Sequence, residues 1–449
     1  MSQPTTGYAK YMRKWASLSI GIPRKYFGSS GVLSERLSNV RHNTVIMYSA
    51  NKAVTATYVF LFSIIFVRYK LYAMNIKMVD LVGQYLKIKE ETDAQMQNVI
   101  NTSQFINGAK CKEFSANLAE YLGVARAITC ANGTDALQIA LMGLGLQRGD
   151  EVIVPAFTYV ATAEVIALLG LVPVLVDVEW DTFNIDPSKI GEAISPRTRA
   201  IVPVHLFGQC ANMEQILQIA RKHNLFVVED NAQAMVANWK GLLDGRENPK
   251  SGTMGNIGCT SFFPSKNLGC FGDGGAMFTN DGELAGKLHC IANHGQKVKY
   301  HHSMVGCNSR LDTLQAAVLD VKLKSLDSYV ASRQSAAAYY LENLSGIEGI
   351  ELPVTAGYTT HSYHQFTIKV ADGKRDALKE FLAKRDIPSM VYYPLPLHHQ
   401  EAYRDMAKIA GGLENSVELS GRVLSLPMHT ELTEEQLHYI CKGIKAFYR

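Results

Sequence analysis

Short apolar runs alternate with helical segments between residues 127 and 279, and this pattern constrains the fold most strongly. Each run is four to seven residues long and is bounded by turn-forming residues such as Gly, Pro, Asn or Asp. Strands that are buried on both faces have continuous apolar sequences of this kind. The pattern therefore predicts an α/β fold with a mainly parallel central sheet and helices on both faces. The predicted strands are 127–130, 151–155, 172–178, 200–204, 225–229, 259–263 and 276–279.

Helical patterns surround this region, and a smaller unit follows it. A long helical stretch runs from about residue 315 to 344, and after it the pattern is that of a small α+β unit. We therefore divide the chain into a leader (1–73), a large domain (74–320) and a small C-terminal domain (321–449). The predicted helices are 84–104, 108–122, 136–144, the segment ending at 169, 213–223, 315–344, 374–385 and a last helix from 434; the small unit has strands near 348–353 and 364–370.

The first 73 residues differ from the rest in composition. They contain ten Lys or Arg residues and a single acidic residue, Glu35. An apolar run of fifteen residues, 53–67, is shorter than the ~20 residues that a membrane-spanning helix needs. We expect the native product to start at Met74 and 1–73 to be a leader that is either unstructured or wrongly included. A membrane anchor at 53–67 is the alternative.

Charge and cysteine content narrow the class of protein. Residues 74–449 carry 35 basic and 40 acidic side chains, and this mildly acidic balance argues against a nucleic-acid-binding surface. The eight cysteines are scattered, without a C-x-x-C motif or zinc-ligand spacing, so we expect no metal site. Reduced thiols in a cytoplasmic protein are the simplest explanation.

The stretch 259–269 carries the most informative side chain. A predicted buried strand ends before Pro264, Lys266 follows, and a glycine-rich loop comes next. The ammonium group of a lysine at the mouth of a buried strand is costly to desolvate, so it is either paired or has a lowered pKa. A lowered pKa makes the amine nucleophilic toward carbonyl carbons. The alternative is a lysine that caps a turn and extends to water.

Other polar side chains follow predicted strands at the same edge of the sheet, where ligands of parallel sheets bind. The segment 132–135 (Asn-Gly-Thr-Asp) opens a helix and forms either an anion site or an ordinary N-cap. Asp230 is suited either to pair with a protonated ring nitrogen or to cap a helix, and Gln233 faces the same space. Tyr159 either stacks on a flat ring or packs in the core.

These parts together match the requirements of one cofactor, pyridoxal phosphate, which needs a lysine, an acid, an anion site and a stacking surface. The ordered set of motifs resembles the DegT/DnrJ/StrS family of sugar aminotransferases, pyridoxal-phosphate enzymes of fold type I. The resemblance covers residue 74 to the C-terminus. The motifs that carry it are 131–137 (ANGTDAL), 155–162 (PAFTYVAT), 229–233 (EDNAQ), 261–269 (SFFPSKNLG), 272–275 (GDGG) and 308–312 (NSRLD).

The resemblance implies a role for each matching residue in the cofactor site. Lys266 would link covalently to the cofactor and shuttle protons, and Asp230 would hold the ring nitrogen protonated. Gln233 would contact the ring hydroxyl, and Tyr159 would stack on the ring. The phosphate would be held by Thr134, the Asp135 amide, Ser261 and, from the partner subunit, Asn308. The family therefore implies a homodimer with shared active sites.

Within the family, the chain is most similar to transaminases that use L-glutamate to aminate UDP-2-acetamido-2-deoxy-3-oxo-glucuronate for surface polysaccharide (O-antigen) synthesis. Arg310 would pair with the sugar carboxylate, although arginine also occurs there in relatives that use neutral sugars. Tyr392 and Tyr393 would contact substrate from the second subunit, and His302 would also contact it. The family pattern has histidine where this chain has Tyr392.

Two alternatives to this function stay open. One is an aminotransferase that acts at C4 of a UDP- or dTDP-linked 4-keto-deoxysugar, and the other is a non-catalytic regulator with the same fold. A separate departure from the family pattern is the polar stretch 242–249 (LLDGRENP). It is predicted to be an insertion that extends a surface loop near the site.

Overall fold

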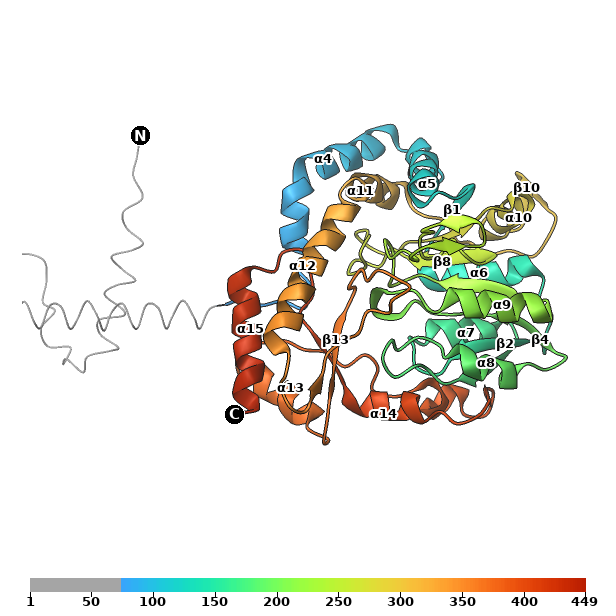
Figure 1. Cartoon of the computed structure of the whole chain (residues 1–449). Coiled ribbons are helices and arrows are strands. Elements are labelled where there is room, and N and C mark those ends of the chain that lie inside the picture. Colours follow the sequence, from blue (N-terminus) through green and yellow to red (C-terminus); the bar gives the residue numbers. More distant parts are fainter. Residues whose placement is uncertain (1–73) are drawn as a thin grey trace, which may run out of the picture. The chain divides into compact units, whose positions relative to one another are not determined.

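A computed structural model describes residues 74–449 of the chain (Figure 1). The expectations for 1–73, including the leader and the possible anchor at 53–67, lie outside the described residues. Residues Asn75–Arg449 form one compact unit. In this described part, no helix combines the length and the apolar character that crossing a membrane requires.

The predicted mainly parallel sheet is confirmed, and it has eight strands in the order β1-β9-β8-β5-β4-β2-β3-β14. Only β9 runs antiparallel to its two neighbours, while the other pairs are parallel. The seven predicted strands all occur, with ends that differ by up to three residues. The strands are β1 (Arg126–Cys130), β2 (Glu151–Pro155), β3 (Val172–Val176), β4 (Thr198–Ile201), β5 (Phe226–Asp230), β8 (Ile257–Ser261), β9 (Gly275–Thr279) and β14 (Lys408–Ile409).

Helices cover both faces of this sheet (Figure 1). Val152 and Val154 of β2 belong to the core cluster beneath one set of helices, whereas Ile153 belongs to the cluster on the other face. Burying such a side chain stabilises the fold by about 1.5–3 kcal/mol, which explains why the strands are apolar at successive positions. The first face carries α6 (Gly133–Leu144), α7 (Ala161–Leu168) and α10 (Gly282–Ala292), and the second carries α8 (Pro187–Ala193) and α9 (Met213–His223).

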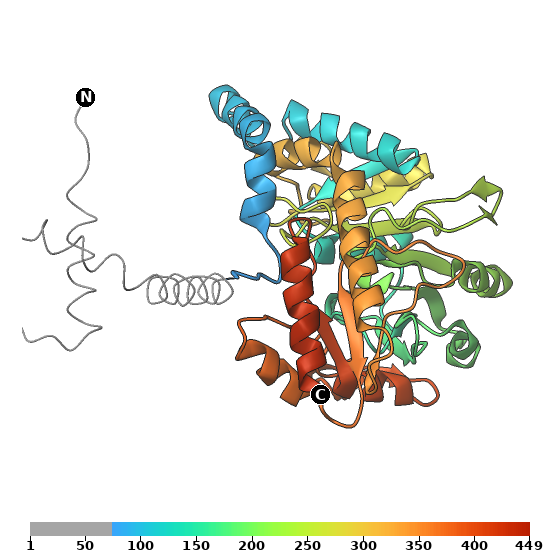
Figure 2. The same cartoon turned by 60° about the vertical axis from the view of Figure 1, so that its left-hand side comes forward.

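The helical stretch predicted for 315–344 is two helices, so the expectation of one continuous helix is wrong. The helices are α11 (Thr313–Leu323) and α12 (Leu326–Leu344). The chain turns at Ser325, whose amide bonds the carbonyl of Lys322 at 3.0 Å. Because of this turn, α11 packs on α4 (Leu81–Thr102) and α5 (Ala109–Leu122), while α12 lies beside α15 (Glu434–Phe447), as Figures 1 and 2 show.

The C-terminal part of the chain forms a second, antiparallel sheet, β12-β13-β15. The same part also supplies β14, which pairs with β3 of the large sheet. The division of the chain at residue 320 therefore remains a proposal, because a strand from the C-terminal part belongs to the sheet of the large domain. The elements here are β12 (Ile350–Glu351), β13 (Phe366–Val370), α13 (Arg375–Ala383), α14 (Glu414–Arg422) and β15 (Val423–Leu426).

The polar stretch 242–249 contains a short hairpin of β6 (Leu242–Leu243) and β7 (Arg246–Glu247). Asp244 and Gly245 between the strands both have positive φ angles, as the Asp-Gly turn of a tight hairpin requires. Asp244 pairs with Arg221 near the C-terminal end of α9. That end of the helix leads into the start of β5, so the tip of the hairpin lies away from the carboxyl end of β5, where Asp230 stands. The expectation that this loop extends near the site is wrong.

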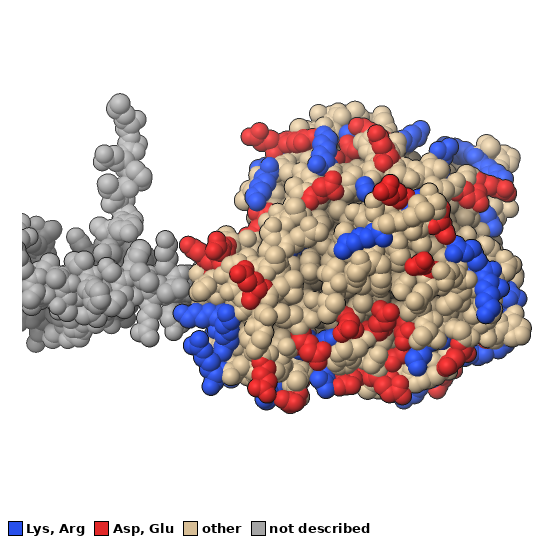
Figure 3. All heavy atoms as spheres, viewed as in Figure 1, with Lys and Arg blue, Asp and Glu red and all other residues tan. Residues whose placement is uncertain are grey.

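Surface charges are mixed in sign, and acidic and basic side chains alternate over the face shown in Figure 3. Exposed pairs such as Lys324–Glu91 contribute at most about 1 kcal/mol each. Buried charge has a larger effect on stability. Within the described residues, the most enclosed carboxylate lies in β5.

Glu229, in β5, is fully buried and accepts four hydrogen bonds. One comes from His205 Nε2 at 2.8 Å, and three come from backbone amides of the loop 252–255 at 2.6–2.8 Å. His205 Nδ1 accepts from the Ala211 amide, so the ring proton is on Nε2. The carboxylate therefore joins β5, the segment after β4 and the loop before β8.

Replacing this carboxylate by an amide tests its contribution to stability. Glu229→Gln retains the size of the side chain but has a single acceptor oxygen, so it leaves buried donors without partners. We expect the free energy of unfolding to fall by about 3 kcal/mol, measured by urea denaturation. Glu247→Gln, on the exposed strand β7, is the matched control and should change stability by less than about 0.5 kcal/mol. Equal effects of the two variants would contradict this account.

Candidate active site

The sheet brings Asp230 and Lys266 together at the carboxyl ends of two neighbouring strands. Asp230 is the last residue of β5, and its register partner in the parallel strand β8 is Cys259. Lys266 follows β8 in a tight turn, in which its amide bonds the carbonyl of Phe263 at 2.8 Å. The chemistry-bearing lysine and acid therefore share one edge of the sheet, as the sequence predicts.

Burial determines the charge behaviour of this pair. It lowers the pKa of Lys266 to about 8, although part of the residue is accessible to water, and the attraction of Asp230 opposes this shift. Burial also raises the pKa of Asp230, and four groups oppose that shift: the Ala232 amide, the Thr162 hydroxyl, Lys266 and His205. The amine is thus partly uncharged near neutral pH, which is the form that attacks a carbonyl carbon.

The carboxylate of Asp230 is held on both oxygens. Oδ2 accepts from the hydroxyl of Thr162 at 2.8 Å, and Oδ1 accepts from the Ala232 amide at 3.1 Å. Thr162 is buried, with 1% of its surface exposed. The sequence analysis gave Thr162 no role. No periodicity relates it to Asp230, and the available signal was its place at the end of the motif 155–162, which carries the family resemblance.

Gln233 and two tyrosines form a wall beside this pair. Gln233 Oε1 accepts from the Phe207 amide at 2.9 Å, and its Nε2 donates to the Tyr393 hydroxyl at 3.0 Å. The second hydrogen of Nε2 is left for another acceptor. The ring of Tyr159 lies 6.1 Å from that of Tyr393 and is 57% exposed. Core packing is therefore the wrong interpretation of Tyr159, which offers an open ring face.

Tyr393 belongs to the same chain's site, because it bonds Gln233 directly. The expectation that it reaches the site of a second subunit is corrected on this point. Its neighbour Tyr392 is partly exposed, and the two rings lie 5.9 Å apart.

Two glycines let the start of α6 approach the end of β8 and the start of β9. A Cβ atom at Gly133 would lie 2.6 Å from the Cβ of Ser261, and one at Gly275 would lie 2.3 Å from the carbonyl oxygen of Asn132. Ser261 thus lies against Gly133, the first residue of α6, at a helix N-terminus that favours anions, and Thr134 is the next residue of that helix. The side chain of Asn132 accepts from the Asp135 amide at 2.8 Å, so this amide is already used in capping the helix.

Three other predicted residues lie away from the pair. Asn308 is exposed, and Arg310 bonds Asn293 Oδ1 at 3.4 Å. His302 lies on an exposed hairpin of β10 (Gln296–Val298) and β11 (His301–His302), where its Nδ1 contacts the His294 carbonyl oxygen at 2.8 Å. The described contacts join none of the three to Lys266.

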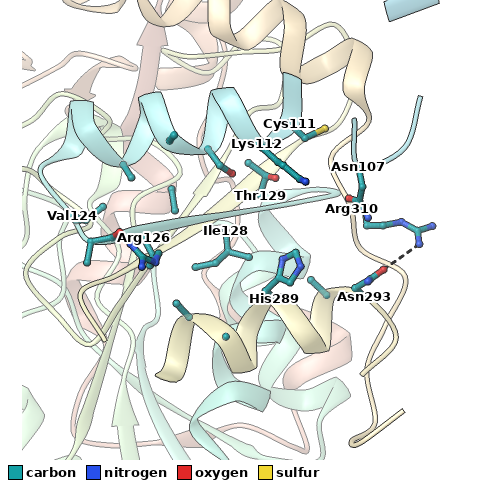
Figure 4. Close-up of a pocket in the computed structure, with 18 of the residues that line it drawn as sticks. Asn107, Cys111, Lys112, Val124, Arg126, Ile128, Thr129, His289, Asn293 and Arg310 are labelled. Atoms are coloured by element: carbon teal, nitrogen blue, oxygen red, sulfur yellow. Dashed lines mark hydrogen bonds between the residues drawn. The ribbon is translucent and has the colours of Figure 1, made fainter. Parts of the chain in front are cut away.

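Arg310 instead lines a separate cavity of about 940 Å³. This cavity lies between α5, β1 and α10, and Figure 4 shows Arg310 and Asn293 at one end of it and Arg126 at the other. It is distinct from the edge of the sheet that carries Lys266.

A protein-family model, the DegT/DnrJ/EryC1/StrS aminotransferase family, matches residues 86–445. The chain belongs to this family. It is 45% identical over 370 residues to the UDP-2-acetamido-2-deoxy-3-oxo-D-glucuronate aminotransferase of Pseudomonas aeruginosa, covering 82% of this chain and 99% of the relative. It is 44% identical to a pleiotropic regulatory protein of Geobacillus stearothermophilus, covering 84% and 99%. It is 41% identical to the dTDP-3-amino-3,4,6-trideoxy-alpha-D-glucose transaminase of Streptomyces venezuelae, covering 83% and 96%.

Solved structures agree with this assignment. A DegT/DnrJ/EryC1/StrS aminotransferase from Brucella abortus is 40% identical with a TM-score of 0.79, covering 83% of this chain and 99% of that chain. NtdA from Bacillus subtilis, solved with bound pyridoxamine phosphate, is 33% identical with a TM-score of 0.73, covering 80% and 82%. The chain is thus a pyridoxal-phosphate-dependent sugar aminotransferase.

The chain's own geometry fits this cofactor. A partly uncharged amine, a buried acid and a glycine-lined helix N-terminus lie at one edge of the sheet. An aldehyde, a pyridine nitrogen and a phosphate need these three groups.

The pKa of Lys266 yields a prediction for the cofactor-free protein. Because only the uncharged amine reacts with an acylating reagent, modification of Lys266 should be half-maximal near pH 8, whereas ordinary surface lysines require a pH near 10. Asp230→Asn removes an attraction that favours the charged amine, so the midpoint should move to lower pH. Peptide mass spectrometry across a pH series measures both midpoints. A Lys266 midpoint near pH 10 would refute the lowered pKa.

Proposed function

We propose that this enzyme transfers the amino group of L-glutamate to UDP-2-acetamido-2-deoxy-3-oxo-glucuronate, yielding the 3-amino sugar for a surface polysaccharide such as O-antigen. The buried pair of Lys266 and Asp230 at the edge of the sheet is the observation that carries the transamination. The choice of sugar rests on the relative from Pseudomonas aeruginosa, which is 45% identical. We further propose that the enzyme is cytoplasmic.

In this proposal Lys266, Asp230 and the residues of the wall beside them have separate roles. Pyridoxal phosphate, when bound, supplies an electron sink for the carbon that carries the amine. Lys266 would hold the cofactor through its aldehyde carbon and, when free, would serve as general acid and base at the substrate carbon. Asp230 keeps the proton on the ring nitrogen. Tyr159 covers one ring face, and Gln233, oriented by Tyr393, donates to the ring hydroxyl.

The phosphate site draws on the start of α6 and the end of β8. Ser261 and Thr134 supply hydroxyl groups there. Because Asn132 occupies the Asp135 amide, the amides of Gly133 and Thr134 are better placed to donate to the phosphate than the Asp135 amide. Asn308, which is exposed in one chain, would complete the site of a second copy in a homodimer.

Two of the proposed sugar contacts, His302 and Arg310, lie close to Asn308 in the chain. Arg310 is two residues further on, and its 3.4 Å bond to Asn293 leaves most of its five N–H groups for a carboxylate. We propose that Arg310 pairs with the uronate carboxylate of the sugar in the partner's site, and that His302 and Tyr392 contact the rest of the nucleotide-sugar. A bidentate arginine–carboxylate pair suits this recognition.

The experiments described below also distinguish the proposed function from two rival functions. The Streptomyces venezuelae relative is named for a dTDP-linked deoxysugar with its amine at C3, so it supports a different nucleotide and sugar but not a different aminated carbon. Position 392 departs from the family pattern, and a C4 aminotransferase on a 4-keto-deoxysugar is the rival substrate class. The Geobacillus stearothermophilus relative is named a regulatory protein. A purely regulatory role has no use for an uncharged lysine amine beside a buried acid, so we favour catalysis.

The two half-reactions are tested separately by absorbance of the bound cofactor. L-Glutamate should convert the band of the lysine-bound cofactor to that of the amine form and release 2-oxoglutarate. The UDP-linked 3-oxo sugar acid should then restore the first band and release the amino sugar. Conversion by glutamate without restoration, followed by restoration with a 4-keto-deoxysugar, would move the substrate to the rival class.

Lys266→Ala is the control for this experiment. It should retain the fold, measured by circular dichroism, and lose turnover by at least 10⁴-fold, because it removes both the covalent attachment and the proton shuttle. Wild-type turnover in Lys266→Ala would refute the assignment of the site.

Arg310→Met tests the sugar carboxylate separately from the amino donor. Losing a charge-assisted pair should raise KM for the sugar acid by about 10- to 100-fold while the half-reaction with L-glutamate is unchanged. Arg126→Met is the matched control, because Arg126 lines the same cavity and loses the same charge. An equal effect of both variants would indicate a general effect of charge and not recognition by Arg310.

A further inference from the structure

The hydrogen bond between Thr162 and Asp230 joins residues that follow or end two strands that are not neighbours in the sheet. Thr162 lies in the first turn of α7, which follows β2, whereas Asp230 ends β5, and β4 lies between those two strands. The hydroxyl of Thr162 nevertheless reaches Oδ2 of Asp230 at 2.8 Å. It is buried, with 1% of the residue exposed. A buried hydroxyl that spans a strand to reach one carboxylate oxygen needs an explanation beyond helix capping.

The backbone of Asp230 is fixed independently of this bond. Its amide donates to the carbonyl of Pro203 at 2.9 Å, and its carbonyl accepts from the His205 amide at 3.0 Å. The backbone does not fix rotation of the carboxylate, because the terminal torsion of an aspartate is broad. The Ala232 amide holds one oxygen, Oδ1. The second oxygen is held by Thr162.

We propose that Thr162 is a positioning residue for transamination: its hydroxyl fixes the rotation of the Asp230 carboxylate and aims a remaining lone pair at the ring nitrogen of the bound cofactor. This inference rests on the role proposed above for Asp230. It assigns to α7 a task in catalysis, although no side chain of α7 touches substrate in the proposed mechanism.

The same bond favours the charged form of Asp230. Four ionisable groups lie close enough to interact with the charge of this carboxylate: Lys266, His205, Cys259 and Tyr393. Burial raises the pKa of Asp230, and the donors at its two oxygens oppose that shift. Removing the hydroxyl of Thr162 therefore favours a protonated carboxyl group, which cannot hold a second proton on the ring nitrogen.

Three substitutions separate the hydroxyl from the volume of the side chain. Thr162→Val retains the shape and removes the hydroxyl, while Thr162→Ser retains the hydroxyl and removes a methyl group. Thr260→Val is the matched control, because Thr260 is also buried and its hydroxyl bonds a backbone carbonyl, that of Asn231, at 3.2 Å.

In the holoenzyme, Thr162→Val should lower kcat of the glutamate half-reaction by about 10-fold and leave KM for L-glutamate within about 2-fold. The pH at which the absorbance of the bound cofactor changes should move upward. A positive charge on the ring nitrogen lowers the pKa of the nitrogen that joins the cofactor to Lys266. The variant loses part of this positive charge, so that pKa should rise. Thr162→Ser and Thr260→Val should both retain the wild-type pH profile.

The cofactor-free protein provides a second measurement. With Asp230 less charged, Lys266 loses an attraction, so its modification midpoint in Thr162→Val should fall below that of the wild type. Thr162→Ser should not change it. If Thr162→Val does not fold, Thr162→Ala compared with Thr162→Ser isolates the hydroxyl, since both lack the methyl group.

The possible outcomes distinguish this inference from the proposed function. If the wild type converts with L-glutamate but Thr162→Val retains its kcat and both pH midpoints, Thr162 is structural only and the inference is overturned. If Thr260→Val shifts the midpoints as much as Thr162→Val, the effect is one of core packing and the inference is overturned as well. If the wild type does not convert with L-glutamate, the proposed function itself fails.

Discussion

Two consecutive buried carboxylates at the end of β5 hold neighbouring elements of the fold together and form part of the active site. Glu229 faces the interior and accepts four hydrogen bonds, which join β5 to the segment after β4 and to the loop 252–255. Asp230 faces the opposite side and accepts only two. Burying a carboxylate is unfavourable unless donors compensate for the lost water. The fully compensated residue stabilises the strand, and the less compensated one retains capacity for a ligand.

The site around Asp230 draws on distant parts of the sequence because parallel strands place their ends at one edge. Residues from the starts of α6 and α7, the end of β5 and the turn after β8 meet there. Tyr393, from the C-terminal part of the chain, closes the wall through Gln233. The sheet thus fixes the positions of the side chains around Asp230. The segment with Asn308 and Arg310 lies apart from them and is available for contacts with other molecules.

The sequence was most informative where burial leaves a periodic pattern. Strands covered on both faces are almost continuously apolar, and an amphipathic helix repeats its apolar side chains every three or four residues. These two patterns predicted β2 and α9 to the residue. The break between α11 and α12 was missed because Lys324 and Ser325 are both acceptable within a helix. Lys266 and Asp230 were found because buried charge is rare. Thr162 was not, because a hydrogen bond between residues 68 positions apart leaves no local signal. The capping bond to the Asp135 amide is local, but the Asn-Gly-Thr-Asp pattern suits an anion site equally well, so the sequence left both interpretations open.

The pairing of β14 with β3 has a consequence for synthesis on the ribosome. β3 ends at Val176, but its edge partner is Lys408–Ile409. More than half of the chain's length is translated between the two. Until the partner emerges, β3 presents unpaired backbone groups that can pair with another nascent chain. Polypeptides that terminate early would retain this open edge, so we expect truncated products, more than the full-length enzyme, to require chaperones.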